Sequence, residues 1–395
     1  MTQDVRRFSS PEADGGRVPW VDAAKGVCII LVVMMHATRG VGEAMGGEGC
    51  MHDVVAFARP FRMPDFFLVS GLFLSRVIDR GWRGYADKRV VHFLYFYLLW
   101  LLIQSGVKFG QVSGGSFSGF AGQLAVALVE PYGTLWFIYL LAVFSTVTKL
   151  LRGVPSMLLL GAAAALEIAP IHTEWFLLNE FCERWVYFLG GYLLAPHIFR
   201  LADRATGRRA AVLAILGVWA AVNGVFALTP SGVAGYPTLA TLPFVSLALG
   251  AAGAMAIVTM AALLTETRFA RPFRYAGRAV YLAFFLPMAA TRTALLKLGI
   301  IQDVGLVSLI VTIVAVLLPL LLERLVRNTP AAFLFRRPAA FHIAPPRTVR
   351  LQTGGVTPAG RWAAAQATRS RMSVASGGRV SVSEHGWPWL GVSSA

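Results

Sequence analysis

The sequence predicts an all-α polytopic membrane protein, a bundle of about ten transmembrane helices. Of its 395 residues, 56% are hydrophobic and only 14% are charged, which is less polar surface than a soluble protein needs. Apolar runs of around twenty residues recur between Val21 and Val326, and a bilayer demands a helix of this length. The runs show no two-residue period, so they do not predict an outer-membrane barrel.

Ten spans follow from these runs. We place them at residues 21–40, 57–78, 91–109, 134–150, 154–171, 180–199, 210–229, 238–264, 279–299 and 304–326. Lysine and arginine give their orientation, because cytoplasmic loops carry an excess of these residues. With a cytoplasmic N-terminus, the inner segments hold 21 of them, whereas the outer segments and outer halves of helices hold seven. The pattern therefore predicts both termini inside.

The chain divides into three predicted regions: a cytoplasmic segment 1–19, a ten-helix membrane domain 20–327 and a basic cytoplasmic tail 328–395. The first segment has no apolar core, so we expect no cleavable signal peptide. The tail carries eight arginines against one glutamate and no sustained apolar period, which predicts a disordered segment that rests on anionic membrane lipids. Because the remaining basic residues follow the loops, the net charge of +16 predicts no nucleic-acid partner.

Ionisable residues inside the spans are the first candidates for function, because charge in hydrocarbon is costly. Lys25 and His36 are eleven residues apart, about 1,100° of helix rotation, so they share one face with an axial separation of roughly 16 Å. Asp22 lies one turn before Lys25 and is expected to pair with it. A snorkelling lysine and a satisfied interfacial histidine would explain Lys25 and His36 separately, but not their common face.

Further polar residues fall in the predicted outer halves of other spans. Arg62 and Asp65, three residues apart, predict an ion pair at the outer end of the second span, where Pro64 frees a backbone carbonyl. Together with His36 they predict a polar chamber open to the outside, which also includes Glu183, Arg184 and Arg292. Structural hydrogen-bond networks are the alternative explanation for some of these residues. No second histidine or cysteine lies at ligand spacing around His36, so we predict no metal site.

Four stretches resemble the membrane acyltransferase-three superfamily, which includes polysaccharide O-acetyltransferases and glucan succinyltransferases. They are VDAAKGVCIILVVMMH (Val21–His36), FRMPDFFLVSGLF (Phe61–Phe73), GTLWFIYLL (Gly133–Leu141) and VYFLGGYLL (Val186–Leu194). The chain is similar to the YcfT-type branch of bacterial inner-membrane proteins, over about residues 18 to 326. A basic residue, ten intervening residues and a histidine are regarded as essential in this family, and they map onto Lys25 and His36. A basic RxxR motif is also typical, and both Arg80–Arg83 and Arg89–His92 are candidates for it.

The resemblance implies an enzyme that moves an acetyl or succinyl group from cytoplasmic acyl-CoA to a hydroxyl of an extracytoplasmic glycan or lipid. It implies no permanently bound cofactor and a location in the bacterial inner membrane. The neutral imidazole of His36 is suited to act as general base, or it would carry the acyl group as a nucleophile. Arg62 or Arg184 would stabilise the charge that develops on the thioester carbonyl.

The predicted site residues fall into three sets. The catalytic set is His36, Lys25, Arg62 and Asp65. The substrate-binding set is Trp136, Glu183, Arg184 and Arg292. The set that would bind the phosphates of CoA, which arginine holds in bidentate fashion, is Arg80, Arg83 and Arg89.

Two other functions compete with this hypothesis. A transporter or flippase for a glycan or lipid would use the polar chamber to bind without reaction. Transport offers no reason for the Lys25–His36 spacing, and we see no similarity between the two halves of the chain, which transporters usually show. A non-catalytic sensor or scaffold is the third hypothesis, because fold does not fix function.

Overall fold

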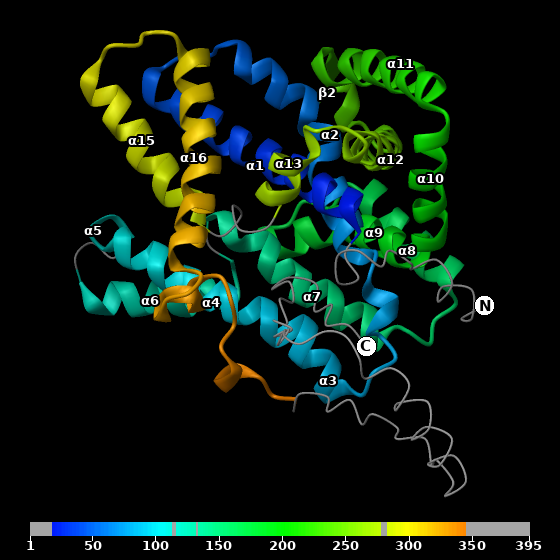
Figure 1. The fold of residues 1–395 in the computed structure, drawn as a ribbon, viewed down its shortest axis with the longest axis horizontal. Coiled ribbons are helices and arrows are strands. Elements are labelled where there is room, and N and C mark those ends of the chain that lie inside the picture. Colours follow the sequence, from blue (N-terminus) through cyan, green and yellow to red (C-terminus); the bar gives the residue numbers. More distant parts are fainter. Residues whose placement is uncertain (1–17, 113–115, 132, 278–282, 345–395) are drawn as a thin grey trace, which may run out of the picture.

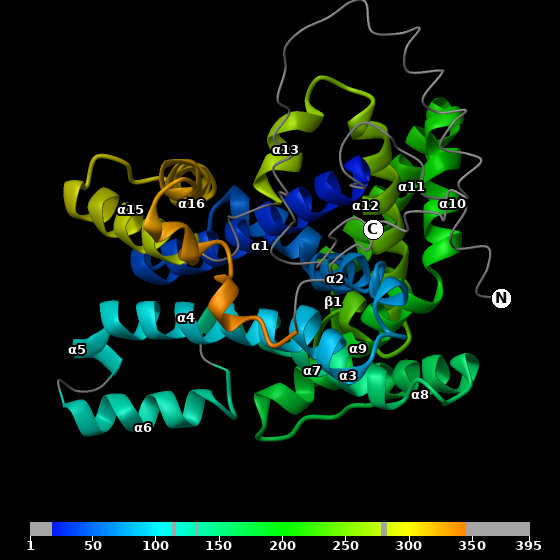
Figure 2. The same cartoon turned by 60° about the horizontal axis from the view of Figure 1, so that its bottom comes forward.

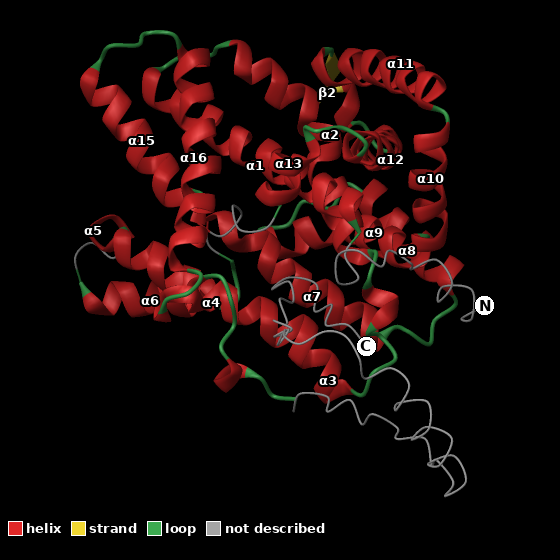
Figure 3. Ribbon diagram, viewed as in Figure 1, coloured by secondary structure: helices red, strands yellow, loops and turns green. Residues whose placement is uncertain are grey.

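The structure is a computed structural model, which describes residues 18–112, 116–131, 133–277 and 283–344. Within these ranges the chain is built almost wholly of helices (Figures 1 and 3). The helices are α1 (Pro19–Met45), α2 (Cys50–Gly71), α3 (Trp82–Ala86), α4 (His92–Val107), α5 (Phe109–Val112), α6 (Phe117–Ala127), α7 (Trp136–Leu150), α8 (Ser156–Ile168), α9 (Phe176–Leu193), α10 (Ala195–Gly207), α11 (Arg209–Leu228), α12 (Val245–Thr265), α13 (Ala270–Ala276), α15 (Phe285–Leu298) and α16 (Val304–Val326). The strands are β1 (Pro230–Val233) and β2 (Tyr236–Thr238), which form an antiparallel hairpin between α11 and α12.

Each of the ten predicted spans overlaps at least one of these helices. Six segments of the described chain are long and apolar enough to cross a membrane: Pro19–Met45, Trp82–Val107, Gly133–Leu150, Arg209–Leu228, Val245–Thr265 and Val304–Val326. The helices α2 and α9, at two other predicted spans, carry the charged residues singled out above, while α8 and α15 have only 13 and 14 residues. The predicted fold class, an all-α polytopic membrane protein, is confirmed.

Helix α1 lies at the centre of the bundle, where it packs against α2, α12, α13 and α16 (Figure 1). Helix α2 packs in turn against α9 and α12. The α2–α9 contact depends on two glycines, because a Cβ at Gly71 would collide with the carbonyl of Phe188, and one at Gly191 with the carbonyl of Leu68. Small residues permit such close approach between membrane helices. This contact holds α2 and α9 together beside α1.

Helix α6 is an element that the hydropathy pattern did not predict, because eleven residues are too few for a span. It runs back alongside α4 (Figure 2), and the hydroxyl of Tyr97 on α4 donates to the carbonyl of Ala127. The chain then continues through the turn Gly133–Leu135 into α7. This turn lies next to the candidate site described below.

Residues 328–344, which we call the strap, return from α16 to lie against α4 and the π-helical turn Asp87–Val91. Tyr95 donates to the carbonyl of Phe333 (3.0 Å) and Trp100 to that of Leu334 (3.1 Å). Arg337 forms an ion pair of 3.0 Å with Asp87, and the two side chains are only 4% and 5% exposed. The first part of the predicted tail is therefore packed on the membrane domain. Its remainder, residues 345–395, lies outside the described residues, as does nearly all of the predicted segment 1–19.

Candidate functional site

A cavity of about 510 Å³ lies beside the half of α1 that we predict to be the outer half, and we call it the His36 cavity. Its volume falls in the range typical of ligand sites, about 300 to 1,000 Å³. It is walled by α1, α2, α9 and the start of α7. The polar and aromatic lining residues are His36, Arg39, Glu43, Arg59, Arg62, Phe66, Thr134, Trp136, Phe137, Phe176, Glu180 and Arg184.

The sequence of α1 positions His36 on the wall of this cavity. Ile29 and Val32 line the same cavity, and with His36 they follow the three- and four-residue spacing of one helix face. Lys25 lies on this face one turn before Ile29. The ring of His36 is partly buried, and its centroid lies 5.7 Å from that of Phe284. The spacing of Lys25 and His36 predicted that they share one face of α1. At His36 this face lines the cavity.

Arg62 is a buried cation of this cavity, and it forms no ion pair with the described residues, whereas the other unpaired arginines of the lining, Arg39 and Arg59, are exposed. Its side chain belongs to a residue only 9% exposed, and its Nε and Nη1 atoms have no hydrogen-bond partner among the described residues. Its positive charge acts on His36. Arg184 is different, because it forms ion pairs of 3.0 Å with Glu180 and 3.1 Å with Glu183. The charge of Arg184 is therefore already compensated, whereas that of Arg62 is available to a ligand.

The expected ion pair between Arg62 and Asp65 does not form. Asp65 is 1% exposed and accepts a hydrogen bond from the thiol of Cys28 on α1, while Arg62 lines the cavity. Helix α2 is packed on several sides, so two residues three positions apart contact different neighbours. Asp65 on α2 is therefore bonded to Cys28 on α1 and connects the two helices.

The opposite end of α1 carries Lys25, and Arg89 lies close enough to interact with its charge; we call these two cations the basic end. Arg89 is completely buried, and none of its three guanidinium nitrogens has a hydrogen-bond partner among the described residues. The charges of Asp22 and Arg89 both act on Lys25, which agrees with the expected proximity of Asp22. Arg89 belongs to the π-helical turn Asp87–Val91, and such turns occur frequently at functional sites.

The two RxxR candidates have different surroundings. Arg89 and His92 are both buried, and the charge of Arg89 acts on His92. Arg83 is exposed and donates from Nε to the carbonyl of Ile343 in the strap (2.6 Å), while Arg80 is partly buried and its carbonyl accepts from Lys149 (2.8 Å). Of the three arginines expected at the phosphates, Arg89 alone is both buried and close to Lys25. His92, which the sequence named only as the last position of the second RxxR candidate, lies in this group as well.

The remaining predicted residues are divided between three places. Trp136 lines the His36 cavity, as expected. Glu183 lines a neighbouring cavity and pairs with Arg184. Arg292 lines neither cavity and donates to the carbonyl of Gly40 (3.1 Å), which connects α15 to α1. Sequence reasoning missed the aromatic Phe137 and Phe176, since apolar residues in a predicted span carry no signal that separates a cavity wall from a lipid-facing surface.

Comparisons with known proteins show the family of the chain. Residues 18–324 match the model of a family described as an acyltransferase domain. The inner membrane protein YcfT of Escherichia coli (strain K12) is 24% identical over 230 residues, which are 51% of this chain and 64% of YcfT. The chain thus covers somewhat less than two thirds of that relative. No solved structure shows a significant match.

Proposed function

Because the chain belongs to the acyltransferase-3 family, whose members transfer groups other than aminoacyl groups, we propose that it moves an acetyl or succinyl group from cytoplasmic acyl-CoA to a hydroxyl of an extracytoplasmic glycan or lipid. We place this reaction in the bacterial inner membrane. The observation that carries the proposal is the common cavity of His36 and Arg62, an imidazole beside a buried guanidinium without a counterion. Acyl transfer to an alcohol needs this combination of base and cation.

The chemistry assigns one role to each of the two side chains. His36 takes the proton of the acceptor hydroxyl while the hydroxyl oxygen bonds to the carbonyl carbon of the thioester. Arg62 stabilises the negative charge that develops on the carbonyl oxygen. The C–S bond then breaks, and the proton passes from His36 to the sulfur of CoA. Between Arg62 and Arg184, which the sequence left as equal candidates, Arg62 suits the role better because its charge is not compensated.

The basic end supplies a site for the donor. Arg89 and Lys25 would hold phosphate oxygens of CoA, and Arg83 and Arg80 would add contacts nearer the surface. Lys25 and His36 are roughly 16 Å apart along α1. Ile29 and Val32 lie between them on the same face of α1. The extended part of acyl-CoA that ends in the thioester would pack along these apolar side chains and reach the cavity. The length of α1 thus connects a phosphate site with a reaction site.

The family favours this function over the transporter or flippase, which would also use a polar cavity. Whether His36 is a base or a transient acyl carrier is a separate question. If it is a carrier, incubation with radiolabelled acyl-CoA without acceptor leaves label on the protein; if it is a base, the protein stays unlabelled.

The test is release of free CoA by the purified protein in lipid nanodiscs, with acetyl-CoA or succinyl-CoA as donor and a cell-envelope glycan extract as acceptor. We expect wild-type protein to release CoA and form an acylated product, and His36→Ala to do neither. His197→Ala, which alters an exposed histidine on α10, is the matched control and should retain activity. Wild-type rates in His36→Ala, or no donor consumption by the wild type, would overturn the proposal.

A further inference from the structure

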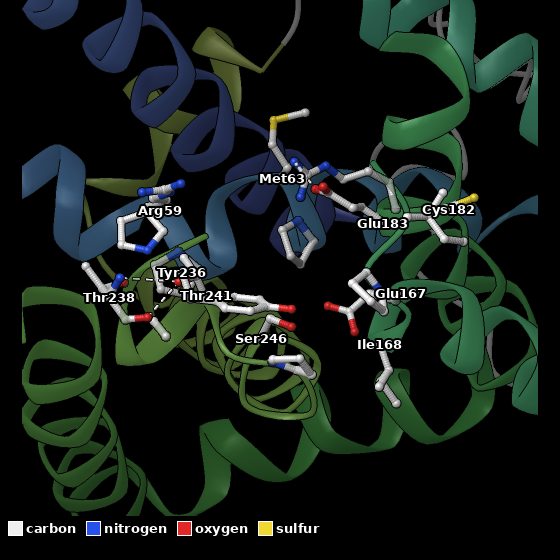
Figure 4. A pocket seen from close by; sticks show the side chains of 18 of the residues that line it. Arg59, Met63, Glu167, Ile168, Cys182, Glu183, Tyr236, Thr238, Thr241 and Ser246 are labelled. Atoms are coloured by element: carbon white, nitrogen blue, oxygen red, sulfur yellow. Dashed lines mark hydrogen bonds and ion pairs between the residues drawn. The ribbon is translucent and has the colours of Figure 1, made fainter. Parts of the chain in front are cut away.

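A second cavity, of about 310 Å³, adjoins the His36 cavity, and we call it the hairpin cavity because the β1–β2 hairpin contributes to its wall (Figure 4). Four residues line both cavities: Arg59, Arg62, Met63 and Arg184. They form a common wall between the hairpin cavity and the cavity that His36 lines. Met63 is flexible and unbranched, and such a residue can move aside at small cost.

Hydroxyl groups and a carboxylate dominate the far side of the hairpin cavity. Glu167, at the end of α8, and Ser246, at the start of α12, face each other in Figure 4. The hydroxyl of Tyr187 on α9 lies 3.3 Å from Oε1 of Glu167 and 3.5 Å from the carbonyl of Ser246. Three helices therefore direct hydrogen-bonding groups toward one space.

Glu167 leaves part of its hydrogen-bonding capacity unused. Its Oε2 atom is buried and has no hydrogen-bond partner among the described residues, and its carboxylate forms no ion pair with any of them. A buried carboxylate oxygen without a donor is costly. A hydroxyl donated by a ligand would remove that cost, because hydroxyl–carboxylate hydrogen bonds are among the strong ones.

The charge of the cavity selects the class of ligand. On the side away from the common wall, an anionic headgroup would meet the carboxylate of Glu167. The arginines of the cavity all belong to the common wall: Arg59 and Arg62 face both cavities, and Arg184 is paired with Glu180 and Glu183. A neutral polyhydroxylated molecule meets donors and acceptors without such repulsion. Tyr236 of the hairpin adds an aromatic ring with a polar tip, which suits the mixed apolar and polar faces of a sugar.

We propose that the hairpin cavity binds the acceptor as a neutral sugar of a glycan, and presents its hydroxyl across the common wall to His36. This inference rests on the proposed function and names the acceptor class for it. Glu167, Tyr187 and Ser246 bind the sugar. Arg62, which lines both cavities, contacts the sugar in one and the acyl group in the other. The donor enters from the basic end and the acceptor from the hairpin, so the two substrates approach the reacting atoms from different cavities.

The test measures the concentration of glycan extract that gives half-maximal CoA release. We expect Glu167→Gln, which keeps the size of the side chain, to raise this concentration at least tenfold while the half-saturating acyl-CoA concentration stays unchanged. Tyr236→Ala, on a different element, should raise it by a smaller factor. Glu174→Gln alters an exposed carboxylate that lines neither cavity and should match the wild type.

The outcomes separate this inference from the function on which it rests. If the wild type consumes donor but Glu167→Gln keeps the wild-type half-saturating glycan concentration, the hairpin cavity is not the acceptor site. If the acyl group appears on nanodisc lipid and glycan extract does not compete for it, the acceptor is a lipid and the inference is wrong. If the wild type consumes no donor, the proposed function itself fails and the inference fails with it.

Discussion

A buried cation lies near each end of α1, Arg62 at one end and Arg89 at the other, but their surroundings differ. At the His36 cavity, Arg62 stands beside Arg184, whose charge two glutamates compensate, and the space around them is open. At the basic end, Arg89 is completely enclosed, and the strap covers the turn on which it lies. Burying an unpaired cation costs several kcal/mol in either place. Because the chain bears this cost near each end of α1, we propose that a negatively charged group binds or develops at both places.

The kind of negative charge differs between the ends. An open cavity with a base and a cation suits charge that develops briefly during a reaction. An enclosed cation suits a permanent charge that stays bound, such as phosphate. We therefore propose a catalytic role for Arg62 and a binding role for Arg89, and kinetic measurements can separate these two roles.

The largest effect is expected at Arg62. Arg62→Ala should lower kcat by about 10²- to 10³-fold, the loss seen when one group that stabilises an oxyanion is removed. The KM for acyl-CoA should change little, because the charge of the carbonyl oxygen develops only in the transition state. CoA release at saturating donor and acceptor measures the effect.

Two variants sharpen this prediction. Arg184→Ala should reduce kcat less, since Arg184 is already paired with two carboxylates. Arg204→Ala, an exposed arginine on α10, serves as the control for loss of one positive charge. Equal losses of kcat in Arg62→Ala and Arg184→Ala would contradict the distinction between them.

The next largest effect is expected at Arg89. Arg89→Met should raise the KM for acyl-CoA by about 10- to 100-fold, the value of one or two hydrogen bonds to a charged group, with a smaller change in kcat. The same variant should keep or raise the unfolding temperature, because a buried cation without a partner is replaced by an apolar side chain of similar length. Donor titration and thermal unfolding in nanodiscs give both numbers. A marked drop in the unfolding temperature, with donor affinity intact, would make Arg89 a structural residue.

Local rules predicted much of this arrangement. Hydropathy predicted a helix at each of ten places, and the structure has a helix at each of them, because a bilayer demands about twenty apolar residues per span. Helix periodicity placed Lys25 and His36 on one face, because that relation depends on α1 alone. The direction of Arg62 and Asp65 could not be predicted in this way, since it depends on which neighbours pack against α2. The ion pair of Arg337 with Asp87 joins residues 250 positions apart, and no local pattern marks such a contact.

The smallest effect is expected from this ion pair, and it tests whether the strap belongs to the basic end. Arg337 donates to both the carbonyl (2.7 Å) and the carboxylate of Asp87, and the backbone N–H of Ile343 donates to the same carboxylate (2.8 Å). These bonds hold the turn that carries Arg89. Arg337→Ala should therefore raise the KM for acyl-CoA by about threefold. A loss of about 1.4 kcal/mol in binding free energy would raise it roughly tenfold, and we expect less because Arg337 acts only through the turn that carries Arg89. Arg336→Ala, at the preceding arginine, is the control.

Two truncations decide between a local and a general effect of the tail. A chain that ends after residue 344 keeps the strap, and its KM for acyl-CoA should equal that of the full chain. A chain that ends after residue 328 loses the strap, and its KM should rise at least as much as in Arg337→Ala, while kcat stays close to the wild type. If both truncations change the KM equally, the contribution comes from residues 345–395. If neither truncation changes the KM, the turn Asp87–Val91 holds Arg89 in place without the strap. The burial of Arg89 that matters for binding then comes from the helices alone.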